Sequence, residues 1–339
     1  MGVTLKEIAK AAGVSEGTAS LAINHRPGVN EETRKKVEEL AKKMGYYPSV
    51  NARSLANKRS GLIGVLMPNI TNLFYSGLVQ GIEASLKAAG YKMILATTGD
   101  NRDYEKEMIE HFISFRVECA VIYPLIRDNP DPEYLELLDK NHIPYFFIGS
   151  RYRGVEAAYV NSDIYQAVSE AAGYLAERGI RDIVYFGGPK NIVSNELKIR
   201  GISDTMAKYG AVFGPEQYFE LEQTNYRCGY LKCRQILSEG YSFQAAMAGD
   251  AYSMLGVYQA LKEAGRKVPK EVSLICFDNI LPPEVCILPL SCIEQNLPAL
   301  VDAIQAMIEK KIRDPQSKDH VLIKTRLIIR DSTKNERRA

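Results

Sequence analysis

The apolar residues near the N-terminus repeat at helical spacing. Thr4 to Glu7 has the form of a capping box, and Gly13 is suited to end a short helix. Between them, four apolar residues follow at i, i+3, i+4 and i+7, and these are Leu5, Ile8, Ala9 and Ala12. This pattern predicts one short amphipathic helix whose apolar stripe faces a core.

Two further helices follow at close intervals. Ser15 is a suitable N-cap for a second helix, and a third is predicted to begin near Asn30 and to end at Gly45. The inward stripe of the second helix would be Ala19, Ala22 and Ile23. The inward stripe of the third would be Val37, Leu40, Ala41 and Met44.

Two short helices joined by a glycine turn and braced by a third are typical of a helix-turn-helix, whose second helix enters the DNA major groove. With the apolar stripe removed, the outward face of the second helix consists of Glu16, Gly17, Thr18, Ser20, Leu21 and Asn24. Ser15 lies at the positive end of that helix, where a phosphate can dock. A solvated three-helix bundle used for protein contacts fits the same spacing.

From Gly61 onward, β-rich apolar runs alternate with helical patterns. The runs are LIGVLMP, YKMILATT, CAVIYPL, PYFFIGS, DIVYFGG, QAAMAGD and VSLICFD. This alternation predicts an α/β body with parallel sheets covered on both faces. The two halves of the body have similar composition, which suggests two subdomains with a cleft between them.

Ligand sites in such sheets gather at the carboxyl ends of the strands. Those positions carry polar or aromatic side chains in this chain. The first run is followed by Asn69, Asn72, Phe74 and Tyr75, and two later runs are followed by Asp250 and by Asp278-Asn279. Asp250 and Asp278 could equally serve as helix caps, and Phe74 and Tyr75 as core residues of a first helical turn.

Charge is distributed unevenly along a chain of 339 residues whose formal net charge is only +2. Residues 1–60 hold 11 basic and 6 acidic side chains, a net of +5, so the remainder is mildly acidic. A basic N-terminal segment on an acidic body is the asymmetry expected of a DNA-binding head.

The six cysteines form no C-x-x-C pair, and the four histidines lie far apart in the sequence. We therefore expect buried free thiols, and neither a metal site nor a cofactor. No apolar run reaches the ~18 residues of a membrane span, and the N-terminus lacks the apolar region of a secretory signal. These features predict a cytoplasmic protein with no membrane partner.

The segment from Thr4 to Pro68, TLKEIAKAAGVSEGTASLAINHRPGVNEETRKKVEELAKKMGYYPSVNARSLANKRSGLIGVLMP, resembles without gaps the opening of the lactose-repressor (LacI/GalR) family of bacterial regulators. The resemblance implies a helix-turn-helix domain over 1–48, a hinge helix or linker over 49–60, and an effector-binding and dimerisation domain over 61–339. It also implies that Leu55, next to Ala52, wedges into the minor groove at the operator centre.

The predicted DNA-contacting residues are the outward face of the second helix together with Thr4, Leu5, Ser15, Asn30, Thr33, Ala52 and Leu55. The reading face departs from the family pattern, because Leu21 stands where an arginine is usual and Glu16 and Gly17 precede it. Glu16 could accept a hydrogen bond from a cytosine amino group, and Leu21 could touch a thymine methyl. The operator sequence of relatives therefore does not transfer to this chain.

The resemblance continues through the body, most clearly in FGGP, LGVYQALKEAGRKVPKEVSLICFDN and SCIEQN. It implies two doubly wound subdomains of periplasmic-binding-protein type, with chain crossovers near Asn161, Leu290 and Lys324. Matching positions place the effector site at Phe74, Tyr75, Ser194, Lys198, Asp250, Asp278 and Gln295. Lys198 stands where the family has an arginine, and a lysine cannot make that planar bidentate grip.

The sequence thus predicts a sequence-specific DNA-binding transcription regulator, a repressor in our interpretation, that is not an enzyme. It would act as a homodimer on near-palindromic double-stranded DNA and respond to a small molecule, a sugar or sugar derivative, held in the body. Inducer and corepressor forms share these parts. The alternatives are a cytoplasmic sugar-binding protein and a carbohydrate-active enzyme using Asp250 and Asp278; no nucleophile elbow or P-loop supports the latter.

Overall fold

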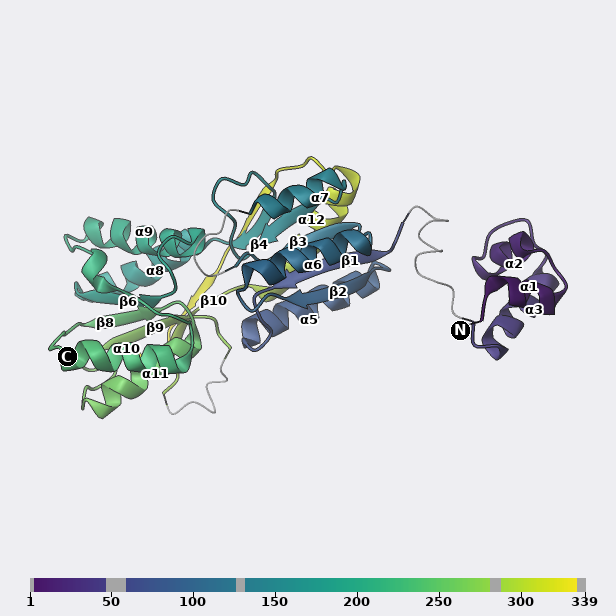
Figure 1. The fold of residues 1–339 in the computed structure, drawn as a ribbon. Helices are drawn as coiled ribbons and strands as arrows, with labels where there is room; N and C mark the ends of the chain where they lie inside the picture. The colour runs from purple at the N-terminus through teal and green to yellow at the C-terminus, as the bar shows by residue number, and fades with distance from the viewer. Residues whose placement is uncertain (1–2, 47–58, 126–131, 281–287, 334–339) are drawn as a thin grey trace. The chain divides into compact units, whose positions relative to one another are not determined.

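A computed structural model describes residues 3–46, 59–125, 132–280 and 288–333. Its contacts divide the chain into two compact units, residues 1–61 and residues 62–339 (Figure 1). The two predicted hinge residues, Ala52 and Leu55, lie outside the described residues.

The N-terminal unit consists of α1 (Leu5–Ala12), α2 (Glu16–Ile23) and α3 (Glu31–Lys43). The predicted capping box is present, because the Glu7 N–H donates to the Thr4 hydroxyl and the Thr4 N–H donates to the Glu7 carboxylate at 2.8 Å. Gly13 ends α1 in the left-handed region, at φ 75°, which a glycine adopts without steric cost. The helix boundaries confirm the three helices predicted from the apolar spacing.

The three helices share one small core. It is built from Ile8, Ala9, Ala12, Ala19, Ala22, Val37 and Ala41. All of these were predicted to face inward. Arg34 of α3 adds a polar brace, since its guanidinium donates to the carbonyl oxygen of Ala22 at 3.2 Å and to that of Arg26 at 2.8 Å.

The first sheet of the body contains six parallel strands. They are β1 (Leu62–Met67), β2 (Lys92–Thr97), β3 (Cys119–Ile122), β4 (Tyr145–Ile148), β5 (Tyr159–Ser162) and β11 (His320–Ile323). The order across the sheet is β11-β5-β4-β3-β1-β2. Val65 of β1 pairs with Leu95 on one side and Val121 on the other, so β1 is central and buried on both faces.

The second sheet also has six strands. They are β6 (Ile183–Gly187), β7 (Tyr218–Glu220), β8 (Ala245–Ala248), β9 (Ser273–Phe277), β10 (Ser291–Glu294) and β12 (Arg326–Ile328). The order is β12-β10-β9-β8-β6-β7. All neighbours are parallel except β12, which runs antiparallel to β10 at the edge.

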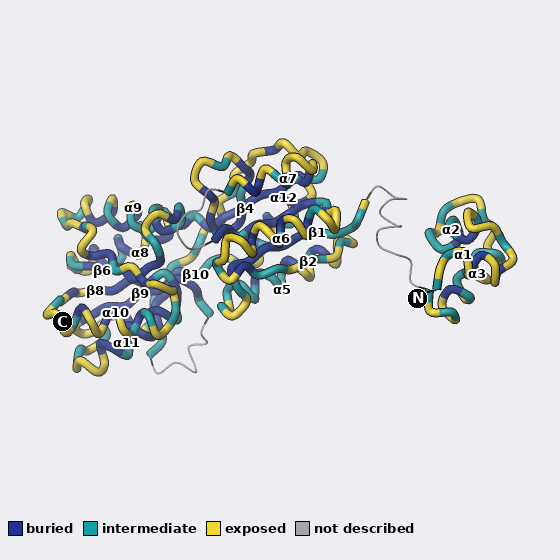
Figure 2. The backbone as a smooth tube through the Cα atoms, in the orientation of Figure 1, coloured by how far each residue is buried: buried dark blue, intermediate teal, exposed yellow. Residues whose placement is uncertain are grey.

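Helices cover both faces of each sheet, as doubly wound folds require. On the first sheet, one face carries α5 (Leu73–Ala88) and α12 (Leu297–Arg313), and the other carries α6 (Arg102–Ser114) and α7 (Glu136–Lys140). On the second, one face carries α8 (Ile164–Ala176) and α9 (Val193–Lys208), and the other α10 (Tyr226–Ser238) and α11 (Ala251–Glu263). The inner strands of each sheet are therefore buried, and the outer helix faces are exposed (Figure 2).

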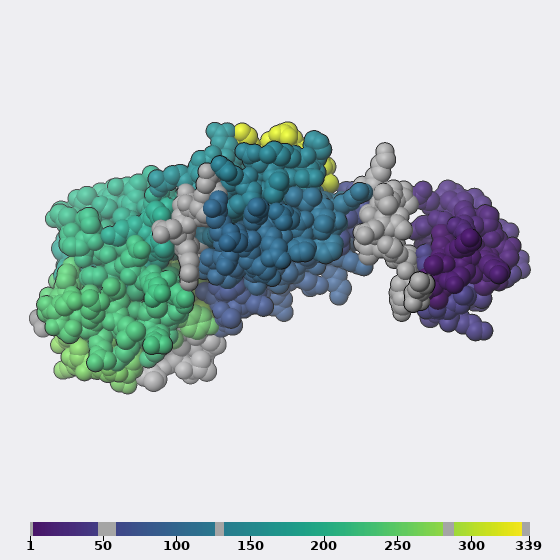
Figure 3. All heavy atoms as spheres, viewed as in Figure 1, coloured from purple at the N-terminus to yellow at the C-terminus, as the bar shows by residue number. Residues whose placement is uncertain are grey.

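Short 3-10 helices, η1 (Glu133–Leu135) and η2 (Pro215–Gln217), precede α7 and β7. The C-terminal helix α12 returns to the first subdomain, where its Leu297 and Val301 side chains pack against Gly77 and Gly81 of α5. In Figure 3 this late, yellow part of the chain accordingly shows among the teal atoms of that subdomain.

The chain passes between the sheets three times, after β5, after β10, and between β11 and β12. The predicted crossover near Leu290 falls about one strand too early. Residues 291–293 still pair with β9 in the second sheet, and β10 ends at Glu294.

The predicted fold class, an all-α head with a body of two doubly wound α/β subdomains, is confirmed. Each of the seven predicted apolar runs contains a strand. The strands β5, β7, β10, β11 and β12 were not among those runs, and β12 is antiparallel where parallel pairing was predicted.

Candidate functional site

The predicted DNA-reading face lies on the surface of the N-terminal unit. Ser15, Glu16 and Gly17 are exposed, while Ala19 and Ala22 of the same helix are buried. Partly exposed positions complete that face, and these are Thr18, Ser20, Leu21 and Asn24. The burial pattern leaves this side of α2 available to a partner.

Several predicted DNA contacts also have structural roles. Thr4 and Asn30 cap α1 and α3. Ser15 caps α2 by accepting a hydrogen bond from the Thr18 N–H at 3.0 Å. The Asn24 side-chain amide donates to the Ser20 carbonyl oxygen at 2.9 Å. Their side chains are therefore already oriented in the absence of DNA.

Two of the remaining predicted contacts sit at helix starts. Leu5 is half-buried at the first position of α1, and the Thr33 N–H donates to the Asn30 side chain at 2.8 Å. Leu21 lies over the turn after α2, where its Cδ1 atom approaches Gly28. Because Leu21 occupies the middle of the α2 face, no long side chain with a hydrogen-bond donor stands at that position.

In the body, a cavity of about 380 Å³ lies between the ends of the two sheets. All seven predicted effector residues line it: Phe74, Tyr75, Ser194, Lys198, Asp250, Asp278 and Gln295. Most of them follow a strand directly or begin the next helix. The parallel topology gathers these ends because the carboxyl ends of parallel strands meet at one edge.

Asp278 has an unusual backbone conformation. It follows β9 with φ 69°, a left-handed conformation that aspartate tolerates better than most residues. The Gln295 amide donates to its Oδ1 atom at 2.7 Å, and the Ser162 hydroxyl donates to the Gln295 oxygen at 2.7 Å. Asp278 is therefore held by residues at the ends of the first two crossover strands.

Two carboxylates and one ammonium group share the cavity. Burial raises the pKa of Asp278 to about 6, which the hydrogen bond from Gln295 partly opposes. Burial also raises the pKa of Asp250, although Ser253 donates to both of its oxygens. Burial lowers the pKa of Lys198, and the two aspartates counter that effect. Each group would gain from a ligand that supplies hydrogen bonds.

Asp250 has a structural role as well, because it caps α11. Asp278 caps no helix among the described residues, so its carboxylate is the freer of the two. On α9, Ser194 and Lys198 are one turn apart and face the cavity together. The Lys198 Nζ lies 4.6 Å from the centroid of the Phe277 ring, which supports the ammonium group from one side.

Aromatic side chains form the opposite wall. Tyr75 packs edge to face on Tyr123, with ring centroids 5.0 Å apart, and Phe74 lies beside Tyr75. Burial raises the pKa of Tyr123 to about 12, so its hydroxyl stays protonated at neutral pH. Such a wall is suited to the apolar face of a sugar ring or to a planar ring.

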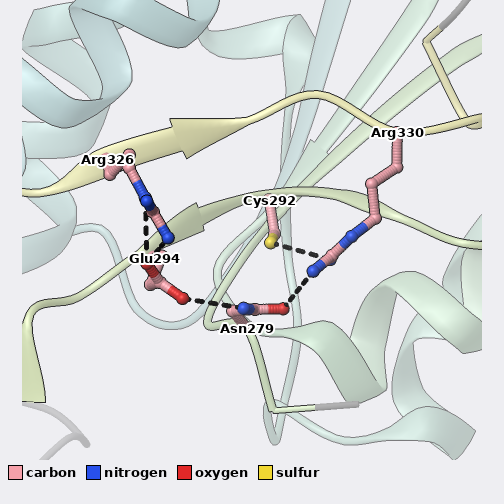
Figure 4. A network of polar contacts seen from close by, with 5 residues as sticks. All are labelled: Asn279, Cys292, Glu294, Arg326 and Arg330. Carbon is pink, nitrogen blue, oxygen red and sulfur yellow. Dashed lines mark hydrogen bonds and ion pairs between the residues drawn. The ribbon is translucent and has the colours of Figure 1, made fainter. Parts of the chain in front are cut away.

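Next to the cavity, a polar network links the second and third crossovers (Figure 4). The Asn279 amide donates to Glu294 at 2.7 Å and accepts from Arg330 at 2.7 Å. Glu294 in turn accepts from Arg326 at 2.8 Å. Asp278 and Asn279 thus connect the turn after β9 to the segments at the ends of β10 and β12.

Sequence reasoning missed several cavity residues. The main ones are Asp100, Tyr123, Pro189, Asn195 and Asn225. Tyr123 directly follows β3, so the rule of inspecting strand ends could have found it. Asn195 could not be found in this way, because it lies in the first turn of a helix whose N-cap, Ile192, carries no polar signal.

Two family models match the chain. Residues 4–49 match that of the bacterial regulatory proteins of the lacI family, and residues 172–333 match that of the periplasmic binding protein-like domain. The chain belongs to the lacI family of bacterial regulators. The helical head and the two-sheet body are the two parts that these models describe.

Similar proteins include catabolite control protein A of Staphylococcus aureus, which is 28% identical over 98% of this chain and the whole of that protein. Catabolite control protein A of Priestia megaterium is 29% identical over 82% of this chain and 83% of that protein.

Solved structures share the fold. The lac repressor dimer bound to operator and the anti-inducer ONPF has a TM-score of 0.84 at 22% identity, covering 99% of this chain and 100% of that one. The transcriptional regulator CelR in complex with cellobiose has a TM-score of 0.73 at 23% identity, covering 97% of this chain and 99% of that one.

Within the described parts of the chain, no helix has the length and apolar character needed to cross a bilayer. The same residues contain no group of three His, Cys, Asp or Glu side chains placed to hold a metal ion.

Proposed function

We propose that this regulator is a transcription repressor whose hold on operator DNA is controlled by a sugar or sugar derivative bound in the body. The observation that carries the proposal is the cavity in which Phe74, Lys198, Asp278 and Gln295 meet between the two subdomains. A ligand there contacts both subdomains and can therefore favour one of their relative arrangements.

The chemistry of the cavity favours a ligand with several hydroxyl groups. The Oδ2 atom of Asp278 accepts no hydrogen bond from the described residues, so it can accept one from a hydroxyl. Lys198 can donate to a ring or hydroxyl oxygen, and the Phe74 and Tyr75 rings can cover an apolar face. The cellobiose held by CelR is a ligand of this class.

The N-terminal unit would provide the operator contacts. In this proposal residues 1–48 form the DNA-binding domain, residues 49–60 the hinge and residues 61–339 the effector-binding and dimerisation domain. Glu16 and Leu21 would read base edges, while the amide groups at the start of α2, beside Ser15, would meet a phosphate. Two such heads in a homodimer would match a near-palindromic site.

A thermal-shift screen of sugars, sugar phosphates and nucleosides on the full chain tests the ligand proposal. A true effector at 100 times its Kd should add about 2.7 kcal/mol to the stability of the body. Asp278→Ala should remove that gain, whereas the matched variant Asp302→Ala, at an exposed position of α12, should keep it. A hit that both variants retain would place the ligand elsewhere.

A binding-site selection from random DNA tests the operator proposal. The native chain should enrich a near-palindrome, and Leu21→Arg should change the preferred bases by adding a bidentate donor, a contact worth about 1–3 kcal/mol of discrimination. Recovery of the same preferred site by both proteins would show that position 21 does not read bases.

A further inference from the structure

A second cavity, of about 280 Å³, lies beside the first crossover strand. It is lined by the turn after β4, by β5 and the start of α8, by the first two turns of α9, and by Leu322 of β11. It shares only Gly149, Ile164 and Ser194 with the larger cavity. The polar residues that line the second cavity are therefore mostly different from those that line the first.

Two polar atoms in the lining are buried and lack a hydrogen-bond partner. The Ser150 hydroxyl belongs to a residue that is only 2% exposed, and the Asn161 side-chain oxygen to one that is 9% exposed. A buried polar group without a partner costs about 1–3 kcal/mol. Two such groups in one cavity are available to form hydrogen bonds with a bound molecule.

The cavity also holds two arginines. The Arg151 guanidinium lies 5.3 Å from the centroid of the Tyr159 ring. The Arg200 guanidinium lies 5.0 Å from the centroid of the Tyr165 ring. Within the described part of the chain, neither guanidinium pairs with a carboxylate. The one acidic residue of the lining, Asp163, caps α8 by accepting from the Gln166 N–H at 3.1 Å.

Helix α9 adds to the positive potential. Its N-cap residue, Ile192, offers no side-chain acceptor to the first amide groups, and the first turn of this 16-residue helix lines the cavity at Val193 and Ser194. Helix N-termini attract anions because their free N–H groups and the helix dipole point outward.

From these residues we propose that the second cavity binds a small oxyanion that also carries hydroxyl groups, such as a phosphate ester or a hydroxycarboxylate. Arg151 and Arg200 would hold the anionic group, and Ser150 and Asn161 would bond the hydroxyls. The ligand would sit outside the proposed effector cavity. Ser162, which lines the second cavity, donates to Gln295 and so connects it to Asp278.

Calorimetric titration of the full chain, without DNA or effector, tests the site. The probes are inorganic phosphate, glycerol 3-phosphate and glycerate, with glycerol as the neutral control at equal ionic strength. We expect saturable binding of one anion per chain by glycerol 3-phosphate or glycerate, tighter than that of inorganic phosphate. Whichever of these two probes binds more tightly identifies the preferred anionic group, a phosphate or a carboxylate.

Variants separate this site from its surroundings. Arg200→Gln should weaken binding about tenfold or more, because a charged hydrogen bond is lost. Arg178→Gln is the matched control, because Arg178 also lies over a tyrosine ring, that of Tyr174, but does not line the cavity, so its loss should leave binding unchanged. Asp278→Ala should also retain binding, which keeps this test independent of the proposed effector site.

Ser150→Ala distinguishes a ligand role from a structural one. Because the Ser150 hydroxyl has no partner, its removal should leave the melting temperature without ligand unchanged or higher, yet weaken anion binding several-fold. Absence of saturable binding by every probe would overturn the proposal. So would equal losses in Arg200→Gln and Arg178→Gln, or loss of binding in Asp278→Ala.

Discussion

Asp278 combines a buried carboxylate, a left-handed backbone and a hydrogen bond from Gln295 at one position. The first two of these features destabilise the ligand-free protein. Residues other than glycine rarely adopt the left-handed backbone conformation, and a buried charge loses its hydration. Such costs persist where the surrounding structure holds a residue in place for binding.

The raised pKa of Asp278 makes the stability of the body depend on pH. The folded-state pKa of Asp278, about 6, lies above the usual aspartate value of 3.8. Its contribution to stability is therefore fully present below pH 4 and is lost as pH rises through 6. Asp278→Asn should therefore stabilise the body at pH 7.5 by up to about 3 kcal/mol and have little effect at pH 4. Denaturant unfolding of both proteins at the two pH values measures this, and a loss of stability at pH 7.5 would contradict it.

Glu105 of α6 is a second buried carboxyl, outside the cavity. It accepts hydrogen bonds from Tyr152 at 2.7 Å and Tyr134 at 3.0 Å. Burial nevertheless raises its pKa to about 7. The protonated acid is thus the form that the fold favours, and a glutamine resembles it closely.

Replacing Glu105 should flatten the pH dependence of stability. In the native chain the contribution of Glu105 is present below pH 4.5 and lost as pH rises through 7. Glu105→Gln should thus gain up to about 3 kcal/mol relative to the native chain between pH 4.5 and 8. Unfolding curves across that range test this, and parallel pH profiles for the two proteins would refute it.

At the residue scale, the sequence predicted seven of the side chains that line the cavity but not their ionisation. Phe74, Asp250 and Asp278 were found because they follow strands. The raised pKa of Asp278 could not be predicted, because it depends on burial and on Gln295, 17 residues away. The pairing of Glu105 with Tyr152, 47 residues later, escaped prediction for the same reason.

Among the helices, α10 and α11 approach each other closely through two glycines. A Cβ atom at Gly256 would lie 2.1 Å from the Tyr226 carbonyl oxygen, and one at Gly229 would lie 2.3 Å from that of Ser253. Backbone atoms cannot move aside as a flexible side chain can. The spacing of this helix pair therefore depends on both glycines.

Gly256→Ala should destabilise the body by about 1–3 kcal/mol through overpacking. Gly173→Ala is the matched control, because Gly173 also lies inside a helix, α8, but its nearest neighbour would be 3.8 Å away. That variant should gain about 0.5–1 kcal/mol from helix propensity. Chemical denaturation of the two variants should give shifts of opposite sign; equal shifts would rule out the packing explanation.

At the element scale, the strands within the seven apolar runs were predicted correctly, and those outside these runs, such as β7 and β11, were not. β7 has three residues, and β11 alternates exposed and half-buried positions. Such segments become strands because tertiary partners extend a sheet edge, and local sequence carries little of that signal. The antiparallel β12 arises in the same way, from a return of the chain beside β10.

At the scale of the whole molecule, the three crossovers lie next to the cavity that we assign to the effector. Ser162, Gln295 and Arg326 lie at the ends or starts of the strands that the crossovers join. The Ser162–Gln295–Asp278 chain and the Asn279 network connect them by hydrogen bonds. In our proposal, ligand binding at Asp278 thus biases the relative arrangement of the two subdomains. A change between two such arrangements is what allows a regulator to respond to a ligand.

The central claim is tested most directly by fluorescence anisotropy of the selected operator duplex, titrated with the full chain in the presence and absence of the thermal-shift ligand. The account predicts a change in the Kd for DNA of about 5-fold to 150-fold on adding ligand. In Asp278→Ala the Kd without ligand should be retained and the response to ligand lost. An identical Kd with and without ligand in the native chain, or an equal response in Asp278→Ala, would contradict the account.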